Sequence, residues 1–247
     1  KKARVMKVLH ITLYPQKGTK HTGVSGVASY SKNLIESLPK DNFEHYILCN
    51  KTSRKLEKYQ DSGVEIIRAF NRNFSFFYQA LKWSFKINPD VIHFQHEVRL
   101  FGPLWIAYLL PILISLLRLK SKVIVTLHGV VSLKNVRRDF IESNYNDKPV
   151  FLVKLGFFLL YFPLGVVVNK IIVHEEYFKR VLNEEFLVSK NKLEVIPHGI
   201  ENLSVESRQE ACRHLNLDPK RKIILFAGYY SDYKNLELII DAFSDYQ

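Results

Sequence analysis

The chain has 247 residues and a mass of 28.9 kDa, and 47% of its residues are hydrophobic, which is enough for a large core and excludes a disordered segment. Lys and Arg (36) outnumber Asp and Glu (24), and the resulting formal charge of +12 favours an anionic partner without identifying it. The two cysteines, Cys49 and Cys212, give neither a disulfide framework nor a zinc spacing, so a reduced, cytoplasmic setting is expected.

The first 200 residues alternate between short apolar runs and longer segments with helical spacing. Several runs are apolar almost throughout, as expected for parallel strands that are covered on both faces. Strands are expected at 5–13, 45–49, 64–69, 91–94, 123–127, 170–173 and 193–196, and helices near 26–38, 74–87, 101–118, 150–165 and 176–187. This order predicts an α/β fold with a Rossmann-like, doubly wound parallel sheet.

The pattern changes near residue 200. Residues 200–221 are polar and include a short helical stretch at 205–215, after which a strand is expected at 222–227 and a helix from about 234. One strand and one helix cannot build a core. We therefore expect one domain at 1–200, and at 201–247 a linker with the first βα unit of an incomplete second Rossmann-like domain.

Two uncharged stretches, 100–117 and 155–169, raise the question of a membrane span. A span needs about 20 apolar residues, and both stretches are shorter than this and contain proline. Buried helices are therefore the favoured interpretation. A helix that lies in the bilayer interface is the alternative for 150–165, because its aromatic residues and the basic chain suit lipid head groups.

The loop between the first strand and the first helix is a candidate anion site. Gly23 and Gly26 permit close backbone approach, and the helix that begins near Gly26 presents free N–H groups. The spacing G-x-G-x-x-G does not occur here, so a nicotinamide cofactor is not supported. A mobile surface loop is the other interpretation of these residues.

Polar residues follow the fourth and fifth strands, at the edge where open α/β sheets bind ligands. His96 and Glu97 follow the fourth strand, and His128 and Gly129 follow the fifth. No metal site is expected from His93, His96 and His128, because His93 and His96 alternate in direction and no carboxylate or cysteine pair completes the set. His128 is the stronger candidate for ligand contact because Gly129 leaves space beside it. Glu97 fits either a base near a hydroxyl or a helix cap.

Five motifs then occur in the order found in one known family. They are VLHIT at 8–12 with SGVASY at 25–30, PDVIHFQH at 89–96, VTLHG at 125–129, VIPHGI at 195–200, and ILFAG at 224–228 followed by Lys234 and IIDAF at 239–243. With them the chain resembles the retaining glycosyltransferases of family 4, which have the two-domain GT-B fold. The resemblance covers nearly the whole chain.

The resemblance implies transfer of a hexose, with retention, from a nucleoside diphosphate sugar to a hydroxyl of a glycan or lipid-linked acceptor, without a metal or other cofactor. His128 would contact the transferred sugar as the catalytic residue, and His96 and Glu97 would bind the acceptor. The donor would be bound by Ser25, Gly26, Gly129, Gly199, Gly228 and Lys234. Peripheral contact with an anionic, cytoplasmic membrane face would suit the basic charge and the aromatic helices.

The sequence departs from the family at one contact with the diphosphate. Tyr229 stands where the family usually has Arg, and Ser231 stands where related members place one. The family's Glu-x7-Glu pair would lie after Gln247. The donor site can therefore be predicted only in part.

Three alternatives stay open. The first is a non-catalytic GT-B fragment or subunit that binds an acceptor or a partner while the donor site is supplied elsewhere. The second is a nucleotide-sugar 2-epimerase, whose pattern of carboxylates and histidines we do not find. The third is nucleic-acid binding, which only the charge suggests and which no recognised motif supports.

Overall fold

The chain divides into two units, Lys1–Ile200 and Glu201–Gln247. The computed structural model describes residues 4–19, 25–145, 148–200, 205–226 and 235–244. The assignment of the first unit to the acceptor and of the second to the donor stays a prediction.

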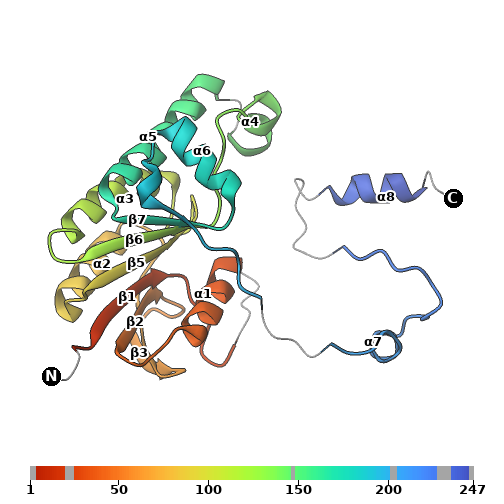
Figure 1. Cartoon of the computed structure of the whole chain (residues 1–247), viewed down its shortest axis with the longest axis horizontal. Coiled ribbons are helices and arrows are strands. Elements are labelled where there is room, and N and C mark those ends of the chain that lie inside the picture. Colours follow the sequence, from red (N-terminus) through yellow and green to blue (C-terminus); the bar gives the residue numbers. More distant parts are fainter. Residues whose placement is uncertain (1–3, 20–24, 146–147, 201–204, 227–234, 245–247) are drawn as a thin grey trace. The chain divides into compact units, whose positions relative to one another are not determined.

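A single eight-stranded sheet forms the centre of the first unit (Figure 1). Across the sheet, the strands are β3 (Glu57–Asp61), β4 (Val64–Phe70), β2 (Phe43–Asn50), β1 (Met6–Thr12), β5 (Val91–His96), β6 (Lys122–Leu127), β7 (Lys170–Val173) and β8 (Leu193–Val195). All neighbours are parallel except β3 and β4. This confirms the predicted α/β, Rossmann-like sheet, and the strand order reverses at β1.

Helices fill the connections between the strands. In the first unit they are α1 (Gly26–Ser37), α2 (Ser75–Ile87), α3 (Leu104–Leu117), α4 (Arg138–Tyr145), α5 (Val150–Val167) and α6 (Glu176–Phe186), with a 3-10 turn at Lys190–Lys192. The predicted helices correspond to α1, α2, α3, α5 and α6. The sequence analysis did not predict α4, whose polar residues follow the loop after β6.

One face of the sheet is apolar and carries the main core. Phe94 of β5 contacts Phe101, which stacks on Phe76 of α2 with ring centroids 4.3 Å apart. Helices α2, α3, α5 and α6 all contribute buried side chains to this core. Removal of this apolar surface from water is the largest stabilising contribution that such a fold has.

The other face is much more polar, and α1 packs on it. Ser31 of α1 hydrogen-bonds Thr12 of β1 at 2.7 Å, and Ile35 packs in a smaller cluster with Ile47 and Ile66. Polar side chains run across this face from β2 to the end of β7, a set that we call the polar row. Its members are His45, His10, His93, Gln95, Thr126, His128 and His174.

Hydrogen bonds fix the first part of the polar row. His45 Nε2 donates to the Pro39 carbonyl at 3.1 Å, so His45 Nδ1 accepts from His10 Nε2, also at 3.1 Å. His10 Nδ1 is then a buried acceptor with no partner among the described residues. Burial and the neighbouring His93 and His45 hold the pKa of His10 well below its usual value, so its ring is neutral.

The hairpin β3–β4 was not predicted, because β3 is a polar edge strand with no apolar alternation. Strand β3 pairs antiparallel with β4 through a two-residue turn, in which Ser62 and Gly63 have φ angles of 52° and 77°. Two successive positive φ angles match the right-handed twist of a tight hairpin. Charged side chains on such an edge oppose pairing with another chain.

In the second unit, α7 (Arg208–His214) and α8 (Leu236–Ser244) match the predicted helices. Helix α7 begins with a capping box between Ser207 and Glu210. The strand predicted at 222–227 is not formed by its described residues, 222–226, among which Ile224 and Leu225 are exposed. A strand needs a neighbouring strand for its backbone hydrogen bonds, and the described part of this unit offers none.

Helix α5 is the one described helix that is long and apolar enough to cross a membrane, with 18 residues and a mean hydropathy of 2.2. A third of this segment is buried against the rest of the first unit. The core helix of a soluble protein passes the same test, so length and composition do not decide between the two.

We expect the first unit to lose stability in acid. Burial lowers the pKa of His93 from 6.5 to about 4. Between pH 4 and pH 6.5 this histidine is therefore mostly protonated in the unfolded chain and mostly neutral in the folded chain. As the pH decreases from 6.5 to 4, the free energy of unfolding should decrease by about 1.4 kcal/mol per pH unit for each such histidine. Denaturant titrations of the chain at several pH values measure this slope.

The variant His93→Gln tests the assignment, because it removes one titrating ring. Its free energy of unfolding at pH 7 should be lower, while its dependence on pH should be shallower. His214→Gln, at an exposed residue of α7, is the matched control and should keep the original slope. Equal slopes in the chain and in His93→Gln would contradict the assignment.

Candidate active site

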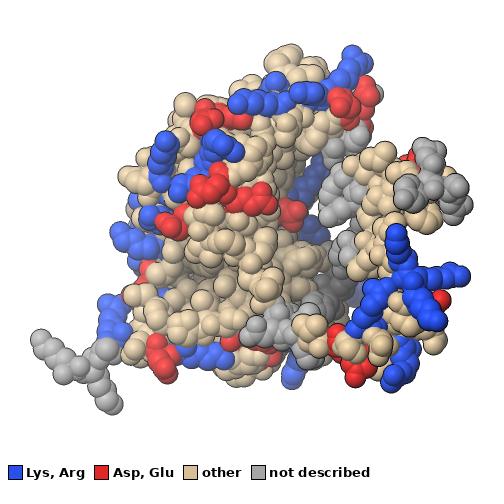
Figure 2. Space-filling model, turned by 45° about the vertical axis from the view of Figure 1, so that its right-hand side comes forward, with Lys and Arg blue, Asp and Glu red and all other residues tan. Residues whose placement is uncertain are grey.

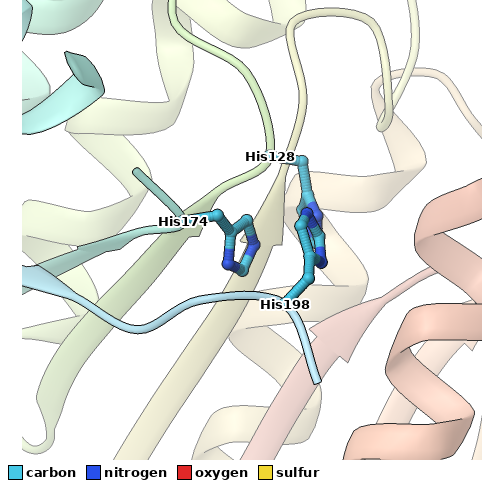
Figure 3. A group of neighbouring side chains, drawn as sticks. All are labelled: His128, His174 and His198. Atoms are coloured by element: carbon cyan, nitrogen blue, oxygen red, sulfur yellow. The ribbon is translucent and has the colours of Figure 1, made fainter. Parts of the chain in front are cut away.

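Three histidines meet where the strands β6, β7 and β8 end. His128 directly follows β6, His174 directly follows β7, and His198 lies three residues after β8. One ring nitrogen from each lies within 4.8 Å of the others (Figure 3). We call these residues the histidine cluster.

Tyr30 of α1 packs against all three rings of the cluster. Its ring centroid lies 4.8 Å from that of His128, 5.3 Å from that of His174 and 5.2 Å from that of His198. All three contacts are edge-to-face, an arrangement that aromatic rings favour. Helix α1 thus holds the cluster together from the polar face of the sheet.

The polar row fixes the proton of His128. Thr126 Oγ1 lies 2.8 Å from His93 Nε2, and the Gln95 amide nitrogen lies 3.4 Å from the same atom. With these two groups as donors, Gln95 Oε1 accepts from His128 Nε2 at 2.8 Å. In neutral His128 the other ring nitrogen, Nδ1, then carries a lone pair.

His174 also presents a lone pair. Its Nδ1 donates to the carbonyl of Ile196 at 2.9 Å, which leaves Nε2 as an acceptor. Nε2 is buried and has no hydrogen-bond partner among the described residues. Since an unpaired buried polar atom is costly, this nitrogen is a place where a ligand donor would gain the most.

Two histidines of the cluster, His128 and His198, have lowered pKa values and are neutral at pH 7. Burial, together with the neighbouring histidines, lowers the pKa of His128 to about 3. Burial and His174 also lower the pKa of His198. Neutral imidazoles accept hydrogen bonds from hydroxyl groups but offer no positive charge to a phosphate. The cluster therefore suits the hydroxyls of a sugar better than a diphosphate.

The geometry of the cluster does not suit a metal ion as it stands. The rings of His174 and His198 are stacked, with centroids 3.7 Å apart and planes inclined by 27°. Imidazole lone pairs lie in the ring planes, so the lone pairs of two stacked rings do not converge on one ion at bonding distance. One ring would have to rotate before the three nitrogens could form a tetrahedral site.

The predicted donor residues that the structure describes surround open space. Ser25 is the N-cap of α1, and its side chain makes no capping hydrogen bond. A Cβ atom added to Gly26, Gly129 or Gly199 would meet no atom within 4 Å. Their positions allow a ligand to approach the backbone, and the first N–H groups of α1 point outward there. Gly228 and Lys234 lie outside the described residues, as do Tyr229 and Ser231.

The predicted acceptor residues lie apart from the cluster. His96 is 2% exposed and stacks near Phe101 on the apolar face, where burial lowers its pKa to about 4. Both its ring nitrogens are buried without a hydrogen bond of ordinary geometry to a described residue. Glu97 is exposed at the start of the following loop. Their role with an acceptor stays a prediction.

Four residues of the site were not predicted: Gln95, Tyr30, His174 and His198. Gln95, Tyr30 and His198 lie inside motifs that were recognised, but none of them was given a role. The register offers a signal for His174, because Leu127 pairs with Val173 and the residues that follow them are both histidines. A histidine directly after each of two paired parallel strands predicts two rings side by side.

A buried arginine anchors the loop between β1 and α1. Arg68 is 1% exposed, and its guanidinium donates to the carbonyls of Tyr14, Pro15 and Asn50 and to the Tyr59 hydroxyl. Carbonyl oxygens satisfy the donors of this charge, which has no carboxylate partner among the described residues. The first residues of the loop are thereby fixed on the polar face.

Comparisons with known proteins identify a family for most of the chain. The family model described as Glycosyltransferase Family 4 matches residues 24–202. No curated protein gives a significant match. Among solved structures, the chain is similar to the UDP-GlcNAc 2-epimerase from Methanocaldococcus jannaschii, at 14% identity and a TM-score of 0.39. That match covers 77% of this chain and 45% of the epimerase, so the chain spans less than half the epimerase's length.

The variant Gln95→Glu tests the hydrogen bond between Gln95 and His128. A carboxylate in place of the amide should raise the pKa of His128 from about 3 by about 1 to 3 units, because opposite charges stabilise each other. An NMR titration of the imidazole resonances measures this shift. Gln95→Met, which adds no charge, should not raise the pKa, and the same pKa in Gln95→Glu as in the unaltered chain would contradict the contact.

Proposed function

The chain belongs to glycosyltransferase family 4, and from this premise we propose that it transfers a hexose from a nucleoside diphosphate sugar to a hydroxyl of a glycan or lipid-linked acceptor, with retention. The observation that carries the proposal is the pair of open acceptors in the histidine cluster, His128 Nδ1 and His174 Nε2. They lie at the carboxyl edge of the sheet, where ligands bind in open α/β folds.

The donor sugar would place its hydroxyls on these two nitrogens. Each hydroxyl can donate to a neutral imidazole, and the two acceptors together fix the sugar's orientation. The diphosphate would lie toward the N-terminus of α1, where Ser25 and Gly26 leave space and the helix dipole favours negative charge. His128 thus binds the reacting sugar, while the phosphate stays outside the histidine cluster.

In the proposed reaction, the acceptor oxygen forms a bond to the anomeric carbon while the bond from that carbon to the diphosphate oxygen breaks. The acceptor's proton passes to the departing diphosphate, so the protein need not supply a nucleophile. Since the proton goes to the leaving group, the low pKa of His128 fits a binding role better than that of a base.

We propose that the reaction needs no metal or other cofactor. The stacking of His174 on His198 supports this, because the lone pairs of the two rings do not converge. The positive end of α1 offers an alternative way to stabilise the diphosphate.

The outer sides of α3 and α5 support peripheral contact with an anionic membrane. The two helices pack side by side, and apolar residues recur at helical spacing on the exposed side of α5. This apolar stripe consists of Phe151, Leu155, Leu159, Phe162 and Val166. Trp105, Ile112 and Leu116 are exposed on α3. Figure 2 shows Lys and Arg side chains, with Asp and Glu side chains beside some of them, at the end of the first unit where Figure 1 places α4 and the start of α5.

We expect His128→Ala to lower turnover by about tenfold or more, because it removes a contact to the reacting sugar. The assay follows release of nucleoside diphosphate from a panel of sugar nucleotides with glycan and lipid-linked acceptors. His214→Ala is the matched control and should keep full activity. The rate should be the same in EDTA.

Two results would contradict this proposal. If an epimerised sugar nucleotide forms and no acceptor is glycosylated, the chain is not a transferase. If sugar nucleotides are neither bound nor consumed, the alternative of a non-catalytic, acceptor-binding fragment is favoured. Calorimetric titration with the same sugar nucleotides separates loss of binding from loss of chemistry.

The apolar stripe predicts binding to lipid vesicles that depends on their charge. The chain should bind phosphatidylglycerol vesicles more tightly than phosphatidylcholine vesicles, since it is basic. The double variant Leu155→Gln with Leu159→Gln should weaken partition roughly tenfold or more, because two exposed leucines no longer enter the apolar region. Leu215→Gln, at an exposed leucine of the second unit, is the control in a vesicle sedimentation assay. Absence of binding to both kinds of vesicle would contradict membrane contact.

A further inference from the structure

A cavity of about 310 Å³ lies between α3, α4 and α5. Its walls are mostly apolar and consist of Leu104, Leu152, Val153, Phe157 and Leu160. The cavity opens to the surface on the side where Leu152 and Lys148 are exposed. It is separate from the histidine cluster and takes no part in the donor site proposed above.

The remaining lining is polar and gathers three hydrogen-bond donors. It consists of Tyr108 of α3, Tyr145 of α4 and Lys148 before α5. Gly156 of α5 makes room for Tyr108, because a Cβ atom at Gly156 would lie 2.7 Å from the Tyr108 hydroxyl oxygen. Burial raises the pKa of both tyrosines, so their hydroxyls carry protons that they can donate.

Among the described residues, the charged side chains at or near the polar part of the lining are positive. Lys148 supplies an ammonium group to the lining, and Arg99 lies close enough to Tyr145 for its charge to lower that pKa in part. No carboxylate lines the cavity among the described residues. Two phenols, an ammonium and a nearby guanidinium form a set of donors that suits a phosphate group.

The apolar end is suited to a hydrocarbon chain. Its volume is about twice that of an engineered cavity of about 150 Å³, which stays dry and binds benzene. A mostly apolar cavity beside an exposed lysine matches an amphiphile that has one hydrocarbon chain and an anionic head. Leu152, which lines the mouth, follows Phe151 of the apolar stripe, so the cavity opens beside the surface that we expect to contact lipid.

We propose that this cavity binds the hydrocarbon chain of a single-chain lipid phosphate, whose phosphate group contacts Lys148, Tyr108 and Tyr145. The hydrocarbon chain of the lipid enters from the membrane side and packs against Val153, Phe157 and Leu160. The phosphate remains at the mouth, where water and cations share its charge.

The cavity is connected to the proposed active site through α5. Phe157 stacks parallel to Tyr161, one turn further on, with ring centroids 6.2 Å apart, and the Tyr161 hydroxyl lies 3.4 Å from the carbonyl oxygen of Gly129. Gly129 follows His128. The identification of this lipid as the acceptor rests on the proposed function, whereas its binding to the cavity does not.

The experiment is a calorimetric titration of the whole chain with hexyl, octyl, decyl and dodecyl phosphate, each below its micelle concentration, and with inorganic phosphate. No sugar nucleotide is present. Affinity should rise by about fourfold for each added CH₂ group and level off once the cavity is full. Inorganic phosphate should bind much more weakly than dodecyl phosphate.

Two variants separate the contribution of the hydrocarbon chain to the affinity from that of the phosphate group. Val153→Phe fills the cavity and should abolish the dependence of affinity on chain length. Lys148→Gln should weaken all the alkyl phosphates by a similar factor, and because Lys148 is exposed its replacement does not endanger folding. Lys154→Gln is the matched control, because Lys154 is not among the residues that line the cavity. It should bind the alkyl phosphates as the unaltered protein does.

The outcomes separate this site from the apolar stripe. Val153→Phe should still bind phosphatidylglycerol vesicles, because the stripe is intact. Affinity that rises with chain length without levelling off, and equally in Val153→Phe, would mean adsorption to the surface and would overturn the proposal. If Val153→Phe glycosylates an acceptor without lipid at the full rate, the proposed function is supported. The cavity is then not part of the acceptor site.

Discussion

The alternation of side chains along β5 is the constraint on which the site depends. Because successive residues of a strand face opposite sides, Phe94 and His96 point into the apolar core while His93 and Gln95 point into the polar row. His96 therefore cannot share the space of His128, although both follow or end neighbouring strands. Gln95 reaches His128 instead and accepts a hydrogen bond from Nε2, which leaves Nδ1 as an open acceptor.

The polar row explains why this open acceptor stays neutral. The hydrogen-bonding partners of His10, His93 and His128 within the row are hydroxyls, amides or other imidazoles rather than carboxylates. Desolvation therefore acts without an opposing charge, and the pKa values of these three rings fall. A carboxylate in place of Gln95 would have made His128 a cation and changed what the site can bind. In the proposed function, neutral His128 therefore contacts the sugar, and the positive end of α1 contacts the phosphate.

The sequence allowed the sheet to be predicted because its parallel strands are apolar runs of ordinary length. It did not reveal β3, since a charged edge strand such as Glu57–Asp61 lacks any alternation, nor α4, which is polar and short. At the site, His128 and the glycines were recognised through family motifs. Tyr30, although it ends the motif at 25–30, and His174 were given no role, because their contacts arise from packing between α1 and the ends of β6 and β7, which lie far apart in the chain. The cavity near Lys148 has the same origin, as three helices form it together.

The position of β1 in the centre of the sheet has a consequence for synthesis on the ribosome. Leu9 of β1 can pair with Ile92 of β5 only after Ile92 has left the ribosome, whereas the other neighbour of β1, the strand β2, is synthesised much earlier. At about 5 to 20 residues per second, the segment from the end of β2 at Asn50 to Ile92 takes roughly 2 to 8 seconds to synthesise, and β1 has no neighbour on its β5 side during that time. During that interval the edge of β1 is open to pairing with another chain. A chaperone that covers strand edges would therefore reduce aggregation most before β5 has been synthesised.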